Sequence, residues 1–377
     1  MGNLTLTHLE YCTYCPKMCR HTCPVSEATG RETFIPQNKQ QRLSQLRKGK
    51  QPYTVETTEP LWACTGCRAC INACVHGVEV GPTLFAGRAE AAKRNVLPPE
   101  LHRYGERFRA RDERLGRSAR DLLPRERFAA EARVGLWPGC DAIDKGAADV
   151  LAQLEVFDRV GAEHVRLVDS QAVCGGYPLL AAGLVEAFRW HAGRVAQELA
   201  RFGTVVMTCS ACVHTLRQLY PAEGVSIPAE ILHVSEYLAQ HVERLPRAVG
   251  AATSAAASAV ETVWYHDPCY LARWEKVMEA PRRVLARVAE VREFAWSHGE
   301  TECCGGGGVL PKTMPAVADA MARRRLHEVS EAGGGTVVTS CGTCKHMLAR
   351  NAPAGVIVRD LVEYVESRTR PSTPPAP

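Results

Sequence analysis

The order of apolar and polar positions is repeated in two stretches of the chain, residues 134–248 and 263–367. Each stretch opens with a short apolar run, "VGLWPGC" or "VWYHDPC", which is typical of a strand. Helical patterns separate these runs from the β-branched runs "TVVMTC" and "TVVTSC", which predict further strands. Each stretch then ends in a predicted strand and helix, "ILHVSEYLAQHV" or "VIVRDLVEYVES". Strands that alternate with helices predict two copies of a parallel α/β unit.

The remaining segments have other patterns. Residues 1–88 contain eight cysteines and a helical pattern, "KQQRLSQLRKGK", but no repeated strands. Residues 89–133 form an Arg-rich connector, in which interleaved acids predict a solvated helix with internal ion pairs. A docking surface for a partner or a membrane is the alternative. We expect an Ala/Ser linker at 249–262 and a disordered tail at 368–377.

Composition narrows the function classes. The chain has 377 residues and 17 cysteines, and its net charge of +5 equals that of residues 88–133 alone. Its first residues lack the pattern of a secretory signal, and no apolar run approaches the ~18 residues of a membrane span. We therefore expect a cytoplasmic protein, attached to the inner face of the plasma membrane only if a partner attaches it. In a reducing compartment, clustered cysteines indicate metal binding or catalysis.

The two N-terminal cysteine groups predict two [4Fe–4S] cubanes. The second, "CTGCRACINAC", has the spacing of bacterial ferredoxins, in which the fourth cysteine binds the other cluster. The first, "CTYCPKMCRHTC", is spaced similarly; zinc, the alternative, favours separated C-x-x-C pairs. We therefore expect a helical dicluster ferredoxin module. Its predicted ligand sets are Cys12, Cys15, Cys19 and Cys74, and Cys64, Cys67, Cys70 and Cys23.

The second α/β copy contains five thiols: Cys269, Cys303, Cys304, Cys341 and Cys344. Cys303 and Cys304 are adjacent, and a disulfide between neighbours is strained. Four glycines follow them, so the backbone can turn tightly and approach a bulky group. Spacing alone predicts a five-thiol metal site here.

These motifs carry a family resemblance. "YHDPCYLARW", "CCGGGG" and "VVTSCGTC" resemble the CCG cysteine-rich domain of heterodisulfide reductase catalytic subunits. They are also similar to the iron–sulfur subunits of glycolate oxidase, anaerobic glycerol-3-phosphate dehydrogenase and lactate-utilisation complexes. The resemblance implies a noncubane [4Fe–4S] cluster at the five-thiol site, with one cysteine bridging irons. The expected fold class is α+β overall: a helical dicluster ferredoxin module followed by two repeated α/β cysteine-rich domains.

The first α/β copy departs from this pattern. It has four cysteines, and Val173 or Gly175 stands where a second adjacent cysteine would be. Four thiolates suit Zn²⁺ or a further [4Fe–4S] cluster, and a copy without metal is the third possibility. The candidate ligands are Cys140, Cys174, Cys209 and Cys212.

Histidines accompany several of the cysteines. His266 and Asp267 precede Cys269, where either a proton-transfer role or a structural role in the strand–turn is possible. We expect other histidines to lie beside the clusters or at the surface; these are His76, His214 and His346. Helix N-termini predicted after each C-x-x-C would favour negative charge.

The chain contains no G-x-G-x-x-G after a strand and no G-x-x-x-x-G-K-[ST]. We therefore predict an oxidoreductase subunit that takes electrons from a flavoprotein dehydrogenase or an electron-transfer flavoprotein. Its acceptor would be a quinone, a membrane cytochrome subunit or a thiol/disulfide compound. Disulfide reduction at the second copy is the alternative, although the incomplete first copy argues against it. A zinc-stabilised scaffold that binds nucleic acid is a third hypothesis, and we expect no nucleic-acid partner.

Overall fold

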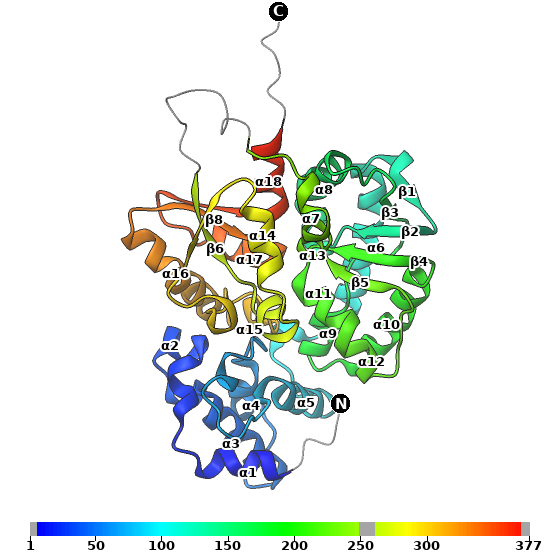
Figure 1. Ribbon diagram of the computed structural model, residues 1–377. Helices are drawn as coiled ribbons and strands as arrows, with labels where there is room; N and C mark the ends of the chain where they lie inside the picture. Colours follow the sequence, from blue (N-terminus) through cyan, green and yellow to red (C-terminus); the bar gives the residue numbers. More distant parts are fainter. Residues whose placement is uncertain (1–5, 249–260, 371–377) are drawn as a thin grey trace, which may run out of the picture.

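A computed structural model describes residues 6–248 and 261–370 and contains three neighbouring units (Figure 1). Helices at the N-terminus, drawn in blue, lie beneath two α/β units, one drawn in cyan and green and the other in yellow to red. Most of the predicted linker at 249–262 and of the predicted tail at 368–377 lies outside the described residues.

Parallel sheets form the centre of both α/β units. One sheet has the order β1-β3-β2-β4-β5 and the other the order β7-β6-β8-β9, and every strand pair is parallel. The prediction of parallel α/β layers is confirmed. The strands are β1 (Phe128–Ala129), β2 (Ala132–Trp137), β3 (Arg166–Val168), β4 (Phe202–Met207), β5 (Glu230–His233), β6 (Thr262–His266), β7 (Glu290–Glu293), β8 (Gly335–Thr339) and β9 (Val356–Asp360).

Helices cover these sheets and make up the N-terminal unit. In the first 130 residues they are α1 (Leu6–Tyr14), α2 (Pro24–Thr29), α3 (Pro36–Arg47), α4 (Val55–Trp62), α5 (Val80–Lys93) and α6 (Tyr104–Leu122). In the first α/β unit they are α7 (Cys140–Asp144), α8 (Ala148–Arg159), α9 (Tyr177–Ala181), α10 (Val185–Leu199), α11 (Ser210–His214), α12 (Tyr220–Ala222) and α13 (Val234–Gln240). In the second they are α14 (Glu279–Leu285), α15 (Leu310–Thr313), α16 (Pro315–Glu331), α17 (Gly342–Ala349) and α18 (Leu361–Thr369).

Local sequence explains these elements. Helix α16 starts with Pro315, whose fixed φ suits the first turn. Its buried residues recur at helical spacing and form one apolar face; among them are Ala318, Met321, Ala322, Leu326 and Val329. Helix α6 matches the predicted solvated helix, since it begins beside an Arg103–Glu106 pair and carries an Arg109–Glu113 pair on its surface.

The cysteines of the α/β units follow the carboxyl ends of neighbouring strands. Strands β2 and β4 precede Cys140 and Cys209, and β6 and β8 precede Cys269 and Cys341. In both α/β units, however, the C-x-x-C lies at the start of a helix and does not precede it. Cys209 and Cys341 are the N-cap residues of α11 and α17, so the second cysteine of each motif is helical.

One apolar core runs through all three units. Trp62 from the N-terminal helices, Phe188 from the first α/β unit and Leu326 from the second belong to one buried cluster. Helix pairs α2–α16, α5–α9, α8–α18 and α13–α14 pack across the boundaries. In residues 6–248 and 261–370, no helix is long and apolar enough to cross a bilayer.

Candidate iron–sulfur sites

The first N-terminal set brings together Cys12, Cys15, Cys19 and Cys74. Burial, together with the nearby thiolates of the other three, raises the pKa of the Cys12 thiol to about 12. Burial likewise raises the pKa of Cys19 to about 11. Buried thiolates repel one another, and a bound metal stabilises the thiolate form. This arrangement is therefore suited to binding a cationic group. The residues predicted from spacing are therefore neighbours.

The second N-terminal set surrounds Cys70. Burial raises the pKa of Cys70 well above its usual range, and the thiolates of Cys67, Cys23 and Cys64 add to the effect. A cavity is lined by all four of these cysteines. Lys39 is buried beside them, with its Nζ 3.6 Å from the Cys23 Sγ. A buried cation beside this thiol set fits an anionic cluster.

The second α/β unit buries its five thiols together. The Cys304 and Cys344 Sγ atoms are 3.2 Å apart, and Cys303 is in contact with Cys269. Cys344 is also in hydrogen-bonding contact with Cys341. None of the five side chains is more than 7% exposed. These five side chains are therefore placed to bind one group through several thiolates.

The N-terminal unit and the second α/β unit meet at a thiol pair. The Cys67 thiol is in hydrogen-bonding contact with Cys303, and this contact together with burial raises the pKa of Cys67. The Cys303 Sγ is also 3.5 Å from the Thr65 Oγ1. Sequence reasoning did not predict this contact.

The glycine run lies against the same segment. A Cβ at Gly307 would stand 2.6 Å from the Thr65 carbonyl oxygen, and one at Gly308 would overlap the carbonyl oxygen of Cys64. Gly308 also has φ +62°, a region that favours glycine. The glycines therefore allow a close approach between the two units, in addition to any approach to a bound group.

The four thiols of the first α/β unit form a chain of contacts. Cys140 touches Cys174, which touches Cys212, and Cys212 touches Cys209. Cys209 also contacts Cys341 of the other unit, so the two sites share a boundary. A zinc ion with Zn–S bonds of about 2.3 Å needs its four sulfurs within about 4 Å of one another. Among the described residues, the groups gathered within 4.8 Å do not include these four. Val173 is buried in the apolar core where a fifth thiol is missing.

Two buried arginines, which sequence reasoning missed, connect the units. Arg88 is fully buried and donates hydrogen bonds to carbonyl oxygens in all three units, namely those of Leu61, Trp62, Cys64, Ala181 and Gly308. Arg273 donates to the carbonyl oxygens of Cys67, at 2.6 Å, and Thr301, at 2.5 Å. Both place positive charge beside thiols. No local pattern distinguishes Arg88 from the exposed arginines that follow it.

A tyrosine pair lies at the same junction. The Tyr177 and Tyr270 hydroxyl oxygens are 2.5 Å apart. Tyr177 donates to the Thr65 carbonyl oxygen at 3.1 Å, so Tyr270 is the donor to Tyr177. Tyr270 opens a π-helical turn, Tyr270–Trp274, that also contains Arg273.

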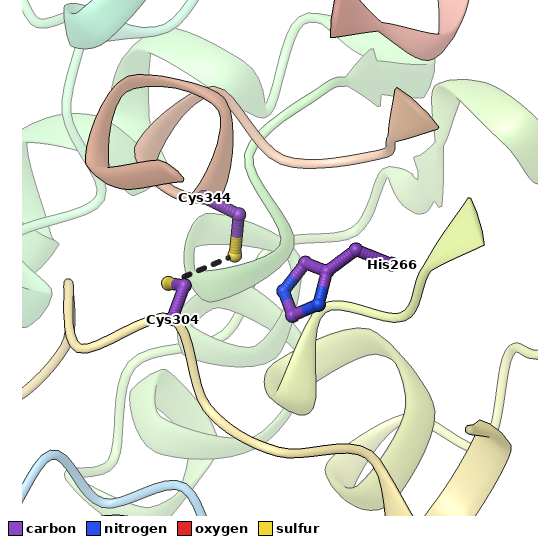
Figure 2. Close-up of side chains that lie close together, drawn as sticks. All are labelled: His266, Cys304 and Cys344. Atoms are coloured by element: carbon purple, nitrogen blue, oxygen red, sulfur yellow. Dashed lines mark hydrogen bonds between the residues drawn. The ribbon is translucent and has the colours of Figure 1, made fainter. Parts of the chain in front are cut away.

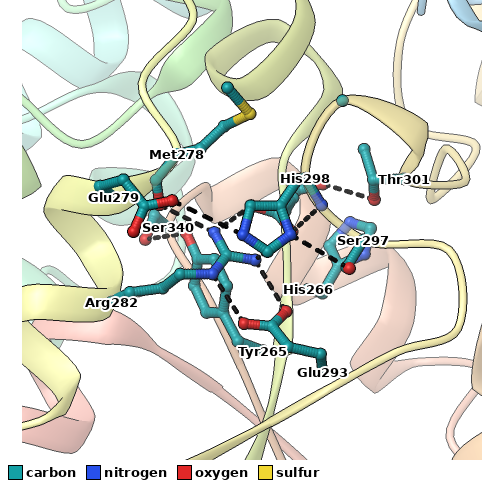
Figure 3. A network of polar contacts seen from close by, with 12 residues as sticks. Tyr265, His266, Met278, Glu279, Arg282, Glu293, Ser297, His298, Thr301 and Ser340 are labelled. Carbon is teal, nitrogen blue, oxygen red and sulfur yellow. Dashed lines mark hydrogen bonds and ion pairs between the residues drawn. The ribbon is translucent and has the colours of Figure 1, made fainter.

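Asp267 has a structural role. Arg282 pairs with both Glu293 oxygens at 2.7 Å (Figure 3). It also pairs with both Asp267 oxygens at 2.8 Å. The main-chain N–H of His298 also donates to Asp267. The Asp267, Glu293 and His298 side chains lie close together, and the Arg282 guanidinium is ion-paired with both carboxylates. This network anchors the turn after β6.

His266 lies on the cysteine side of the same turn. It is fully buried, and its ring faces Cys304 and Cys344 (Figure 2). Burial, with the Arg325 charge, lowers the pKa of His266 to about 3. The Arg325 Nε donates to the His266 Nδ1 at 3.0 Å, which is a structural contact of the kind considered above. His214 is buried and 2.7 Å from Glu275, whereas the ring of His76 stacks on Tyr11.

Comparisons with known proteins agree with this arrangement. Residues 8–78 match the family described as "4Fe-4S dicluster domain", and residues 263–349 match "Cysteine-rich domain". The chain is 25% identical over 410 residues to one of the subunits of dihydromethanophenazine:CoB–CoM heterodisulfide reductase from Methanosarcina barkeri, covering 96% of this chain and 95% of the relative.

Other relatives are longer than this chain. One of the subunits of fumarate reductase (CoM/CoB) from Methanothermobacter marburgensis is 26% identical over 318 residues, covering 82% of this chain and 61% of the relative. "EtfAB:quinone oxidoreductase" of Syntrophomonas wolfei is 26% identical over 343 residues, covering 80% of this chain and 45% of the relative. The chain therefore joins a 4Fe-4S dicluster domain to a cysteine-rich domain, and the resemblance to iron–sulfur subunits of heterodisulfide reductase-type oxidoreductases is confirmed.

Proposed function

We propose that this chain is an iron–sulfur electron-transfer subunit of a multi-subunit oxidoreductase. Cys12, Cys15, Cys19 and Cys74 would hold one [4Fe–4S] cubane, and Cys64, Cys67, Cys70 and Cys23 the other. The five cysteines of the second α/β unit would hold a noncubane [4Fe–4S] cluster. When bound, these clusters would act as one-electron carriers. The protein would bury them, and Lys39, Arg88 and Arg273 would place positive charge nearby.

The observation that carries this proposal is the contact between Cys67 and Cys303. It joins the dicluster segment to the five-cysteine site without intervening solvent-exposed residues. The donor would be a flavoprotein dehydrogenase or an electron-transfer flavoprotein, and the acceptor a quinone, a membrane cytochrome subunit or a thiol/disulfide compound. The names of the relatives support both ends of this path. We place the protein in the cytoplasm, with any membrane attachment made by a partner.

We also propose that residues 134–248 and 263–367 are copies of one domain, after a 1–88 module and an 89–133 connector. Support comes from the shared strand order, because β3-β2-β4-β5 and β7-β6-β8-β9 have the same sequence of crossovers. For Cys140, Cys174, Cys209 and Cys212 we favour a further iron–sulfur cluster over zinc, since their sulfurs are not gathered as a single zinc ion requires.

Anaerobic purification followed by iron, acid-labile sulfide and zinc analysis tests the proposal. Three four-iron clusters correspond to about 12 iron atoms per chain, and a fourth cluster raises this to about 16. About 12 iron atoms with about one zinc would instead assign zinc to the first copy. Zinc without labile sulfide would refute the electron-transfer function.

Disulfide reduction is the second candidate function. The contact between Cys209 and Cys341 favours it, because this contact places the two cysteine-rich sites at one boundary. A mixed disulfide or thiol substrate should then change the EPR spectrum of the site that Cys341→Ser removes. An unchanged spectrum at saturating thiol would exclude this activity.

A further inference from the structure

His266 has one ring nitrogen in use and one without a partner. The residue is the last of β6, fully buried, and its carbonyl oxygen accepts a hydrogen bond from the Thr339 Oγ1 at 3.0 Å. The Nδ1 atom is 3.0 Å from the Arg325 Nε, whereas Nε2 has no hydrogen-bond partner in the described structure. A buried polar nitrogen without a partner costs free energy, and a group bound beside it would offset that cost.

Arg325 fixes the tautomer of this ring. A guanidinium N–H is always a donor, so Nδ1 must be the acceptor. A neutral imidazole then carries its proton on the other nitrogen, Nε2. Arg325 is itself only 2% exposed and lies 3.8 Å over the Phe294 ring, which holds its position. The Nε2 atom is therefore an N–H donor, and it has no lone pair with which to bind a metal.

The Nε2–H points to the thiols. The ligand atoms of His266, Cys304 and Cys344 lie within 4.8 Å of one another. In Figure 2 the ring nitrogen farther from the main chain faces the two sulfur atoms. The nearest acceptor for this N–H is therefore sulfur at the five-cysteine site.

The first α/β unit provides an internal comparison. Trp137 is the last residue of β2 and precedes Cys140 by three residues, as His266 precedes Cys269. Its indole N–H donates to Ser170 Oγ at 3.2 Å and to the Ala172 carbonyl oxygen at 2.8 Å. The donor at this position is thus satisfied by protein in one unit and unpaired in the other.

We propose that His266 is a hydrogen-bond donor to sulfur at the five-cysteine site, is not an iron ligand, and raises the reduction potential of the group bound there. The inference rests on the proposed function, which supplies that group. A donor directed at sulfur stabilises the reduced state, because that state carries more negative charge. Arg325 acts as a positioning residue through the ring.

A mediated potentiometric titration of the anaerobic holoprotein tests this proposal. Dithionite is the reductant, and EPR monitors the signals. The signal that Cys341→Ser removes identifies the site. His266→Phe lacks the donor and His266→Gln keeps an N–H. His327→Phe is the control, since His327 lies on the same helix as Arg325 and its side chain is 73% exposed. A hydrogen bond to a charged group corresponds to about a tenfold change in the oxidised-to-reduced ratio, or about 59 mV for one electron.

We expect the potential to fall in His266→Phe, to remain near the wild-type value in His266→Gln, and to be unchanged in the control, with full iron content in all three. An unshifted potential in iron-replete His266→Phe overturns this inference and leaves the proposed function intact. Missing iron at this site in wild type overturns both. If His266→Phe does not fold, the hyperfine couplings in the EPR spectrum of wild-type protein in D₂O decide the question. An exchangeable deuteron and a weakly coupled histidine nitrogen support the inference, and a directly bound nitrogen refutes it.

Discussion

Replacing Arg88 with methionine should weaken the attachment of the three units. The side chain is fully buried, and four of its carbonyl acceptors lie at 2.7–2.9 Å. A hydrogen bond from a charged donor contributes about 1.5–3 kcal/mol, but the bonds cannot be summed, because burying the guanidinium also costs free energy. Arg88→Met leaves several buried carbonyl oxygens without a donor, each at about 1–3 kcal/mol, and part of this cost is offset because the guanidinium no longer has to be buried; we expect a net loss of about 3–5 kcal/mol.

Thermal unfolding of the anaerobic holoprotein measures this loss. At about 2 °C per kcal/mol, the low end of the range for large domains, Arg88→Met should melt about 6–10 °C below wild type. Arg94→Met is the matched control, because Arg94 caps the same helix and is exposed. If both variants have the melting temperature of the wild-type protein, Arg88 does not hold the units together, and the argument from its hydrogen bonds is refuted.

Three further predictions concern ligation, backbone geometry and pH. Cys74→Ser should remove the EPR signal of one cubane and Cys23→Ser that of the other, each with about four irons lost; loss of the same signal in both variants would contradict crossed ligation. Gly308→Ala should lower the melting temperature by several degrees more than Gly49→Ala, because both have positive φ, +62° and +68°, but only the first meets backbone atoms; equal effects would show that the close approach costs nothing. Burial raises the pKa of Asp360 to about 7, so its contribution to stability is present below pH ~4 and is lost as pH rises through 7. Asp360→Asn should therefore gain stability relative to wild type between pH 5 and 8 in chemical denaturation, and a constant difference would refute this.

The secondary structure was largely predictable from local patterns. The run "KQQRLSQLRKGK" overlaps helix α3, and the β-branched runs before Cys209 and Cys341 are strands β4 and β8. These elements follow from periodicity and propensity, which act over a few residues. In each N-terminal thiol set, three cysteines follow one another closely in the sequence, and the fourth, Cys74 or Cys23, is predicted from the crossed pattern of bacterial ferredoxins.

The contacts between units could not be predicted in this way. Arg88 looks like the solvated arginines of α6, yet it is buried because carbonyl oxygens from three units converge on it. The contact between Cys67 and Cys303 joins residues more than 200 positions apart, and no pattern in one segment specifies the other. The orientation of His266, on strand β6, depends on Arg325, which comes from helix α16.

The glycine run has a consequence for how the two thiol sites are spaced. Gly307 and Gly308 lie directly on the main chain of Cys64 and Thr65, so a side chain at either position would push the two backbones apart. Cys64 belongs to one thiol set, and the glycine run directly follows Cys303 and Cys304 of another. Because main chain meets main chain here, the backbone sets the spacing between the two sets, and side-chain rotamers do not change it.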